Sequence, residues 1–415
     1  MTITLSDALD RARKIDSQLL SAVTDAAVAR EDRVQAKAAM LPAATSTTQY
    51  LGTQGNGTLP SGRYVSNNGV HLYRAWGVIH QDLSPGTLMG TGIKHAQAAE
   101  AMANAKVEIA KRGLDATVTK NYYSLIASER KYATSQQALQ QAQRFLDITR
   151  DRERVRQVAH SDVVKAELQF EQQKTAYEEA RLAIENARLN LAVMLFPVLN
   201  ENFSVVDDID SARALPGFPE IQEMAERENP DLRVAVESLK QANLDVKSAR
   251  NAFLPTITLE TDYGIEANAF ALHSEVAANR EAGKLPNLGY FLTAGVTLPL
   301  WDWGSLRSKL HQSEYKRQQA QTELSRAQRQ ILSNLYAFFN EASVARASVE
   351  STRRAADLSA ESLRLITLRY QAGESTALEM VDAQTTLTQA RNAYDDAQVR
   401  YRVAIANLQT LTGSF

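Results

Sequence analysis

The sequence contains no cysteine, which excludes a disulfide framework, a thiolate nucleophile and a zinc site built from cysteine. Glycine and proline are also scarce, with 18 and 10 residues in a chain of 415, and they gather in a few clusters. The long stretches between these clusters are rich in Ala, Gln, Glu, Arg and Leu, which is the composition of extended helices and coiled coils. The lack of cysteine fits many compartments, so it does not assign a redox compartment.

Neither sign of charge dominates the chain. Lys and Arg together number 46 and Asp and Glu 48, so no net field attracts nucleic acid or an acidic membrane surface. No stretch approaches 18 consecutive apolar residues, so the sequence predicts no membrane-spanning helix. The opening segment MTITLSDALDRA has no basic segment followed by an apolar run, so we identify no signal peptide. A cytosolic protein and a mature form restarted with Met1 both fit this opening.

Motifs of enzymes are missing as well. The six histidines show neither HExxH nor His-x-His spacing, and the chain has no phosphate-binding glycine loop and no nucleophile elbow. We therefore predict no enzyme, no metal site and no cofactor. An acid–base site built from scattered carboxylates is the one enzymatic alternative that motifs do not exclude.

The sequence is internally duplicated. AYEEA begins at Ala176 and AYDDA at Ala393, an offset of 217 residues (393 minus 176). GVIHQDLSPG (77–86) aligns in the same way with GVTLPLWDWG (295–304), and AKAAMLP (36–42) with ARNAFLP (249–255). Because the offset drifts by only a few residues, we infer two halves of about 210 residues each.

Each half predicts the order helix, strand, strand, long helix, helix. In the first half the helix runs unbroken from Thr4 to Leu41, with Ser6 and Asp7 as candidate caps. The other elements of the first half are strands at 43–52 and about 70–83 and helices at 93–154 and 162–195. The elements of the second half are a helix at 221–254 with a restart at 229–231, strands at 256–264 and 292–298, and helices at 306–370 and 376–411.

The long helices carry a regular seam. In the second half the seam residues follow alternating steps of four and three, which gives a period of 3.5 and specifies a left-handed supercoil. They are Ile331, Leu335, Phe338, Ala342, Ala345, Val349, Thr352, Ala356, Ser359, Leu363, Ile366 and Tyr370. The first half repeats the seam at Val163, Phe170, Tyr177, Ile184 and Leu191. Many seam residues are small, so we expect a broad assembly of closely spaced helices.

The four strands raise a problem of closure. Alternation places Ile257, Leu259 and Tyr263 on one face of a strand, with Thr and acidic residues on the other. This pattern and a length near ~9–11 residues fit tilted strands of a membrane barrel, and alternation alone fits a small soluble sheet equally well. Four strands cannot enclose a barrel, since about eight are needed. The membrane interpretation therefore requires several chains.

At the end of the last strand, LPLWDWG (298–304) resembles the P-[LI]-[FW]-D-x-G junction of the TolC-like outer-membrane efflux family. RYQAGESTALEMVDAQ (369–384) resembles the tip of that family's helical hairpin, and the resemblance covers residues 4–412. It implies a mainly α, internally duplicated TolC-like fold with long coiled-coil helices. In that fold a homotrimer closes a membrane β-barrel of twelve strands and a tunnel of twelve helices.

The resemblance also implies a function and a location. The protein would be the outer-membrane channel of a tripartite efflux or type I secretion system, reaching into the periplasm after removal of a signal peptide. It would be a passive exit duct gated at its periplasmic tips, with a periplasmic adaptor protein and an inner-membrane pump as partners. The alternative from the residues themselves is a soluble coiled-coil scaffold or adaptor whose short strands form a lip domain.

The corresponding division of the chain has seven parts. They are a short helix at 1–42, strands with an extracellular loop at 43–86, the long helix and its hairpin partner at 87–196, an equatorial linker at 197–220, a short helix at 221–255, strands with an extracellular loop at 256–300, and the second long helix and partner at 301–415.

By the same resemblance, the gate lies at the hairpin tips. Tyr370 matches the family's gate tyrosine, and Ser161 and Asp162 match its tip partners. Glu379 and Asp382 lie three apart on one helix face, and three copies of each would form acidic rings. On pattern alone, Tyr370 is also an ordinary seam residue and the two acids are a solvated helix face.

Two further groups of residues are matched by the resemblance. The adaptor-contact turns fall on Val155, Arg156 and Gln157 and on Ala372, Gly373 and Glu374, where the family's V-G-L pattern is altered. A basic gate residue of some members falls on Ser375. The strand–helix junction consists of Pro299, Trp301, Asp302, Trp303 and Gly304. The two tryptophans are either interfacial anchors or packing at a bend, and we interpret the run RDRERVRQ (150–157) as a solvated hairpin end.

Overall fold

The computed structural model describes residues 1–52, 71–200, 202–211, 214–267, 275–277, 284–286 and 288–413. The chain divides into two compact units. We call the first the hairpin unit; it contains Met1–Ala26, Ala103–Val234 and Leu324–Phe415. The second, the sheet unit, contains Ala27–Met102 and Ala235–Glu323.

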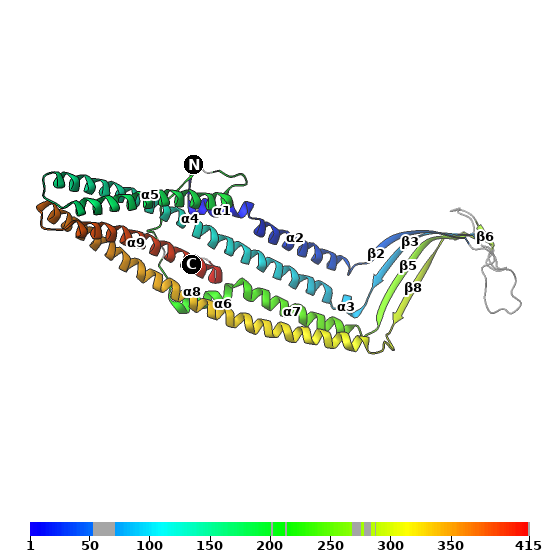
Figure 1. Ribbon diagram of the computed structural model, residues 1–415. Coiled ribbons are helices and arrows are strands. Elements are labelled where there is room, and N and C mark those ends of the chain that lie inside the picture. The colour runs from blue at the N-terminus through cyan, green and yellow to red at the C-terminus, as the bar shows by residue number, and fades with distance from the viewer. Residues whose placement is uncertain are drawn as a thin grey trace. The chain divides into compact units, whose positions relative to one another are not determined.

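The hairpin unit is built from two antiparallel helical hairpins, α4–α5 and α8–α9, which Figure 1 shows with both turns at the same end of the unit. The four helices are α4 (Thr91–Arg154), α5 (His160–Leu195), α8 (Ser305–Ala372) and α9 (Ala377–Thr412), of which α4 and α8 begin in the sheet unit. The hairpin unit also holds α1 (Leu5–Ile15), α6 (Phe218–Glu228) and the start of α2 (Ser17–Ala38). The positions of α4, α5, α8 and α9 confirm the predicted long helices and hairpin partners of both halves within a few residues.

The prediction of one unbroken helix from Thr4 to Leu41 is wrong. Asp16 adopts an extended conformation between α1 and α2, and its Oδ1 accepts a hydrogen bond from the amide of Leu19 at 2.7 Å. An acidic residue can satisfy the free amides of a new helix in this way, so the chain restarts without glycine or proline. Ser6 is not the first cap either, because Thr4 is, in a capping box with Asp7.

A short parallel pairing joins the N-terminus to the linker between the halves. β1 (Thr2–Ile3) pairs with β4 (Ser204–Val205), which the sequence did not predict. Tyr122 of α4, fully buried, donates its hydroxyl proton to the carbonyl of Val206 at 2.8 Å and lies 3.2 Å from the carbonyl of Ile3. Residues 204–206 of the linker are therefore held against α4 and the N-terminus by these hydrogen bonds.

The core of the hairpin unit follows the predicted seam. Leu335, Ala342 and Ala345 are almost fully buried, and every other predicted seam residue of α8 is buried or half-buried. Small residues dominate where α8 meets α9, in a cluster of Ala342, Ala345, Tyr401 and Ala404. Close helix spacing is possible there because these alanines keep the facing backbones near one another.

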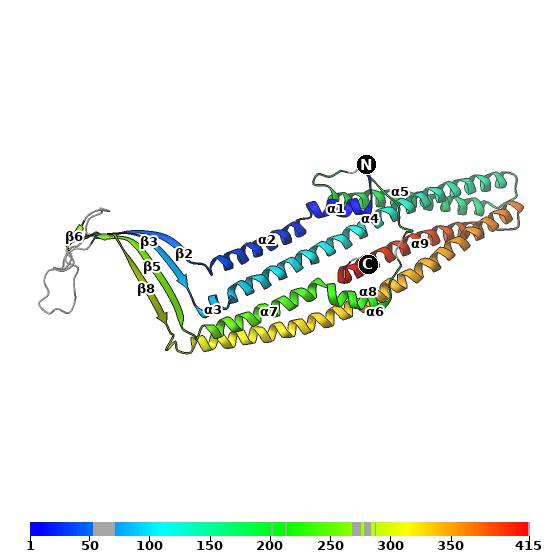
Figure 2. The same ribbon diagram turned by 180° about the vertical axis from the view of Figure 1, so that it is seen from behind.

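The sheet unit carries one four-stranded antiparallel sheet in the order β2-β3-β5-β8, seen side by side in Figure 2. The strands are β2 (Ala43–Gly52), β3 (His71–Asp82), β5 (Thr256–Ala267) and β8 (Leu288–Thr297), which confirms the predicted strands. The unit also holds α3 (Pro85–Leu88), most of α7 (Pro230–Asn251) and a small hairpin of β6 (Glu275–Ala277) with β7 (Lys284–Pro286). The loop predicted at 53–70 and most of the second extracellular loop lie outside the described residues.

The two faces of the sheet differ in chemistry. Ile257, Leu259 and Tyr263 are 39%, 38% and 59% exposed, and on the neighbouring strand Leu292 and Val296 are 67% and 70% exposed. All five lie on one face, because β5 and β8 pair Ile257 with Val296, Thr261 with Leu292 and Tyr263 with Tyr290. The sheet therefore presents uncovered apolar side chains along this face.

The opposite face carries the charged residues of the four strands, together with the exposed Phe291 opposite Asp262. His80 Nδ1 lies 3.4 Å from Glu260 Oε2, and Asp262, two residues along, is only 5% exposed. Arg74 donates a hydrogen bond to Gln49 Oε1 at 3.4 Å. Among the described residues, no helix combines the length and the hydrophobicity needed to cross a lipid bilayer.

Candidate functional site

The two hairpin turns have the same backbone geometry. After α4 the amides of Arg156 and Gln157 donate to the carbonyls of Glu153 and Arg152 at 2.8 Å each. After α8 the amides of Gly373 and Glu374 donate to the carbonyls of Tyr370 and Arg369 at 3.1 and 2.9 Å. In both turns the middle residue is left-handed, with φ of 57° at Arg156 and 81° at Gly373. Such a residue ends a helix by folding the chain back onto its last carbonyls.

The predicted adaptor-contact residues form these turns. Val155 is 62% exposed, and Arg156 and Gln157 are exposed as well. The second turn, Ala372 to Glu374, is also exposed. These side chains are available to a partner protein, and their role in binding one stays a prediction.

Tyr370 lies at the contact between the two hairpins. It is 4% exposed, and its hydroxyl lies 3.1 Å from Thr149 Oγ1 of α4. Its ring packs edge-to-face on Phe145 with centroids 5.3 Å apart, and the guanidinium carbon of Arg152 lies 4.8 Å from the ring centroid. The tyrosine is thus a buried seam residue with one polar contact, and its role as a gate residue remains a prediction.

Arg152 is the tip residue that sequence reasoning missed. Its Nη1 donates to the carbonyl of Tyr370 at 2.7 Å and its Nη2 to the carbonyl of Gln371 at 2.9 Å. It therefore caps the C-terminal end of α8 from the neighbouring hairpin, where a cation is favoured. The interpretation of 150–157 as a solvated end is wrong for this residue. Its position seven residues after Phe145, on the same helix face, was the available signal.

Ser161 and Asp162 lie in the first turn of α5. Ser161 is exposed and Asp162 half-buried, at a helix end where an acidic side chain is favoured. Within one chain the hydroxyl of Tyr370 is hydrogen-bonded to Thr149 instead. The role of Ser161 and Asp162 as tip partners therefore remains a prediction.

Glu379 and Asp382 are both exposed on the first turns of α9. Glu379 has a local role that sequence reasoning missed. The amide of Glu379 donates to Thr376 Oγ1 at 3.2 Å, and Glu379 Oε2 accepts from the amide of Thr376 at 3.3 Å, which is a capping box. The hydroxyl of Ser375 also bonds to this carboxylate, and these hydrogen bonds lower the pKa of Glu379.

The strand–helix junction is a tight turn held by Asp302. Its carboxylate accepts hydrogen bonds from the amides of Gly304 at 3.0 Å and Leu306 at 2.5 Å, so it caps the start of α8. Trp301 and Trp303 are 76% and 89% exposed, and their rings meet edge-to-face 5.5 Å apart. They pack on each other and remain open on their outer sides, and Pro299 beside them is exposed too.

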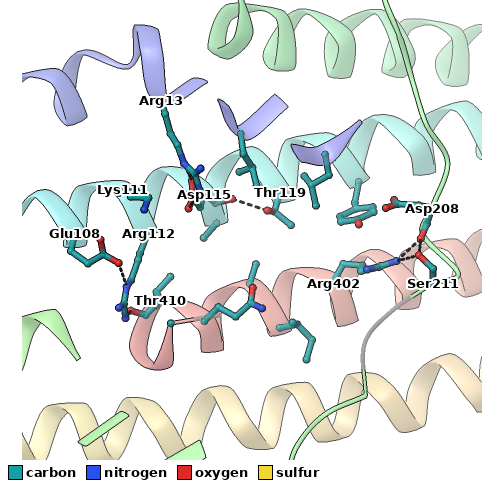
Figure 3. A pocket seen from close by; sticks show the side chains of 18 residues that line it. Arg13, Glu108, Lys111, Arg112, Asp115, Thr119, Asp208, Ser211, Arg402 and Thr410 are labelled. Atoms are coloured by element: carbon teal, nitrogen blue, oxygen red, sulfur yellow. Dashed lines mark hydrogen bonds and ion pairs between the residues drawn. The ribbon is translucent and has the colours of Figure 1, made fainter. Parts of the chain in front are cut away.

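A cavity of about 590 Å³ lies in the hairpin unit between α1, α4, α9 and residues 208–211 (Figure 3). Its charged side chains are mostly paired with one another, with Arg13 Nη2 2.6 Å from Asp115 and Arg112 Nε 2.8 Å from Glu108. Arg402 bonds to the carbonyl of Asp208 and lies 4.8 Å from the ring of the buried Tyr123. Burial raises the pKa of the Tyr123 hydroxyl. Pairing leaves this cavity with little net charge to attract a ligand.

Among the described residues, no group of three or more His, Asp or Glu side chains is placed to hold a metal ion. Four described histidines, His80, His95, His160 and His311, instead pair singly with acids, as His95 does with Asp245 at 3.3 Å. The exposed turns and the buried contact beneath them are therefore the best-defined candidate site, and their surfaces suit protein contact.

The arrangement of two helical hairpins and a duplicated pair of strands defines the class of the TolC-like channel fold. The structure superposes on that of the outer-membrane channel OprN with a TM-score of 0.82 at 18% identity, covering 99% of this chain and 90% of that one. Residues 221–414 match the family described as Outer membrane efflux protein. Over these residues, slightly less than half of the chain, the protein is similar to this family of outer-membrane efflux proteins, and it shares the fold of the outer-membrane channel.

Two sequence relatives extend this similarity. The chain is 24% identical to "Outer membrane protein TolC" of Escherichia coli (strain K12) over 273 residues, 65% of this chain and 55% of that protein. It is 21% identical to "Outer membrane protein TolC" of Vibrio cholerae over 418 residues, 99% of this chain and 90% of that protein. In the first match the chain thus spans little more than half of the relative's length. Both relatives are named as outer-membrane proteins, and these similarities do not favour a soluble coiled-coil scaffold.

Proposed function

We propose that this protein is the outer-membrane channel of a tripartite efflux or type I secretion system. In this proposal it is a passive duct without catalytic activity, and it is gated at the tips of its helical hairpins. The observation that carries the proposal is the two-faced sheet of β2, β3, β5 and β8. Its exposed apolar face, with Leu292 67% and Val296 70% exposed, suits lipid, and its polar face, with the His80–Glu260 pair, suits a water-filled lumen.

The edges of the sheet support a homotrimer. Among the described residues, β2 pairs only with β3 and β8 only with β5, so both outer strands have an unpaired edge. In lipid each unpaired backbone group costs several kcal/mol, so open edges are not tolerated there. Three chains with four strands each would close a barrel of twelve, and their helices would continue it as a tunnel.

The tips support a gate and an adaptor site. Tyr370 and Arg152 join the two hairpins of one chain by a few contacts near the turns, which a modest movement of α8–α9 would break. The exposed turns at 155–157 and 372–374 would receive the periplasmic adaptor, which links the channel to an inner-membrane pump. Glu379 and Asp382 would line the narrow end as acidic rings.

Planar-bilayer recording tests the proposal. Purified protein reconstituted into lipid should give discrete cation-preferring conductance, which falls when Glu379 and Asp382 are changed together to Gln and Asn. A soluble particle that neither enters lipid nor conducts would contradict it. The soluble scaffold alternative predicts that outcome.

A further inference from the structure

Arg130 of α4 joins three parts of the hairpin unit. Its Nε donates to Asp207 Oδ2 at 2.6 Å and its Nη2 to Asp210 Oδ2 at 2.8 Å, both in the linker between the halves. Its Nη1 donates to Gln398 Oε1 of α9 at 2.9 Å. One guanidinium therefore connects the first hairpin, the linker and the second hairpin.

An acid of α9 lies beside this guanidinium without a close contact. Asp395 is 6% exposed, and Arg130 Nη1 lies 3.7 Å from Asp395 Oδ1, which is longer than a hydrogen bond. The guanidinium already donates hydrogen bonds to Asp207, Asp210 and Gln398, so its positive charge stabilises the Asp395 carboxylate only in part. A buried carboxylate that is poorly hydrogen-bonded is unfavourable in its ionised form.

The next residue provides a contrast within the same turn. Asp396 is paired with Lys131 of α4 at 2.5 Å, and its side chain is 62% exposed. Both acids thus face basic residues of α4 from α9, and only Asp395 is deprived of water. The charged and titratable groups around Asp395 are Arg130 and Lys131 of α4, Asp207 and Asp210 of the linker, Asp396 and Tyr394 of α9, and Arg353 of α8, which acts on Tyr394.

We propose that Asp395 is a proton-operated latch, which holds α9 more firmly against α4 and the linker when its carboxyl group takes up a proton. Protonation removes the buried charge, while Arg130 keeps its bonds to Asp207 and Asp210. Because α9 is half of the α8–α9 hairpin, a tighter latch resists movement of that hairpin. The consequence for gating rests on the proposed function; the latch itself does not.

The direction of the pH effect follows from the burial. Burial raises the pKa of Asp395 to about 6, and the charge of Arg130 opposes this rise only in part. The folded state therefore holds this proton more strongly than the unfolded state, whose carboxyl group has a pKa near 3.8. The folded state gains stability as the pH falls through 6 toward 4, and loses it as the pH rises again.

Hydrogen–deuterium exchange of the full chain in lipid nanodiscs tests the latch at pH 7.5 and pH 5.5, after correction for intrinsic exchange rates. We expect peptides covering 394–402 and 207–211 to be several-fold better protected at pH 5.5. Asp395→Asn, which carries no charge, should give the better protection at both pH values. Asp396→Asn is the matched control and should keep the pH dependence of the wild type.

Two outcomes overturn the latch. The first is that the corrected protection of these peptides in the wild-type protein is the same at both pH values. This measurement does not depend on whether any variant folds. The other is an Asp395→Asn protein that keeps the wild-type pH dependence. Bilayer conductance of the same samples separates this proposal from the duct. A protein that conducts without pH-dependent protection contradicts the latch alone, and one that shows the protection but never conducts contradicts the duct alone.

Discussion

Arg156 and Gly373 occupy equivalent positions in the two halves, 217 residues apart (373 minus 156), and both have a left-handed backbone with φ of 57° and 81°. Only glycine adopts this conformation without a steric penalty. The first hairpin turn therefore has the same shape as the second and carries a strain that the second does not have. The side chain of Arg156 is exposed, so no burial compensates for that strain.

Replacing Arg156 with glycine should stabilise the first hairpin. Relief of the left-handed conformation exceeds the extra chain entropy of glycine, and we expect a net gain of about 0.5–1 kcal/mol in the free energy of unfolding. Chemical denaturation measures it. Gly373→Ala should have the opposite effect. A loss of stability in Arg156→Gly would mean that the arginine side chain makes a contact that this structure of one chain does not hold.

Removing Arg152 should loosen the contact between the hairpins. Arg152→Ala removes the side-chain donor that the carbonyls of Tyr370 and Gln371 receive from the other hairpin, and the Tyr370 carbonyl keeps only the amide of Gly373. Peptides covering 369–374 should therefore exchange deuterium faster, and the basal conductance should rise. Arg150→Ala is the control, because Arg150 pairs with Glu167 of its own hairpin at 3.2 Å. If both variants show the same exchange and the same conductance, Arg152 does not hold the two hairpins together.

The hydroxyl of Tyr370 should contribute less to the stability of the hairpin contact than Arg152 does. Tyr370→Phe loses the contact with Thr149 Oγ1, and Thr149 keeps its hydrogen bond to the carbonyl of Phe145 at 2.8 Å. We expect a loss of about 1 kcal/mol. A double-mutant cycle with Thr149→Val measures the coupling, and a coupling near zero would show that the hydroxyl contact is not stabilising.

The helix cap at Thr376 should matter for α9. Thr376→Ala should cost about 1 kcal/mol, because the amide of Glu379 loses its acceptor. The pKa of Glu379 is lowered by the hydroxyl of Ser375 and the amide of Thr376, so its contribution to stability is present above its ordinary pKa of 4.5 and is lost as the pH falls through the lower folded value. Circular dichroism should show that the start of α9 frays in the wild-type protein as the pH falls below 4. In Glu379→Gln the helix content should not change over the same pH range. Fraying of equal extent in both proteins would contradict this assignment.

The sequence predicted those parts of the structure that depend on local periodicity. The seam of α8 and the four strands are set by spacings of three or four and of two residues, and burial follows them. Sequence reasoning missed Arg152, because an arginine in a charged run is expected to be solvated. Its two carbonyl acceptors come from the neighbouring hairpin, which is far away in the sequence. The β1–β4 pairing and the Arg130 contacts depend in the same way on segments far apart in the chain, which no local pattern encodes.

The faces of the sheet offer a matched pair of substitutions. Leu292 lies on the apolar face and is 67% exposed, and Thr293 lies next to it on the polar face. Leu292→Arg should block assembly in the outer membrane, at about 2–4 kcal/mol near the bilayer midplane, whereas Thr293→Arg should assemble and change only the conductance. Equal tolerance of both substitutions in membrane fractions would mean that neither face meets lipid.

The unpaired edges of β2 and β8 require partner strands, so the number of chains in one lipid-embedded particle decides whether this protein closes a barrel as a trimer. Native mass spectrometry of the protein released from nanodiscs should give three chains per particle and no stable monomer. A single folded chain per particle, with the sheet protected from exchange at both of its edges, would contradict the account.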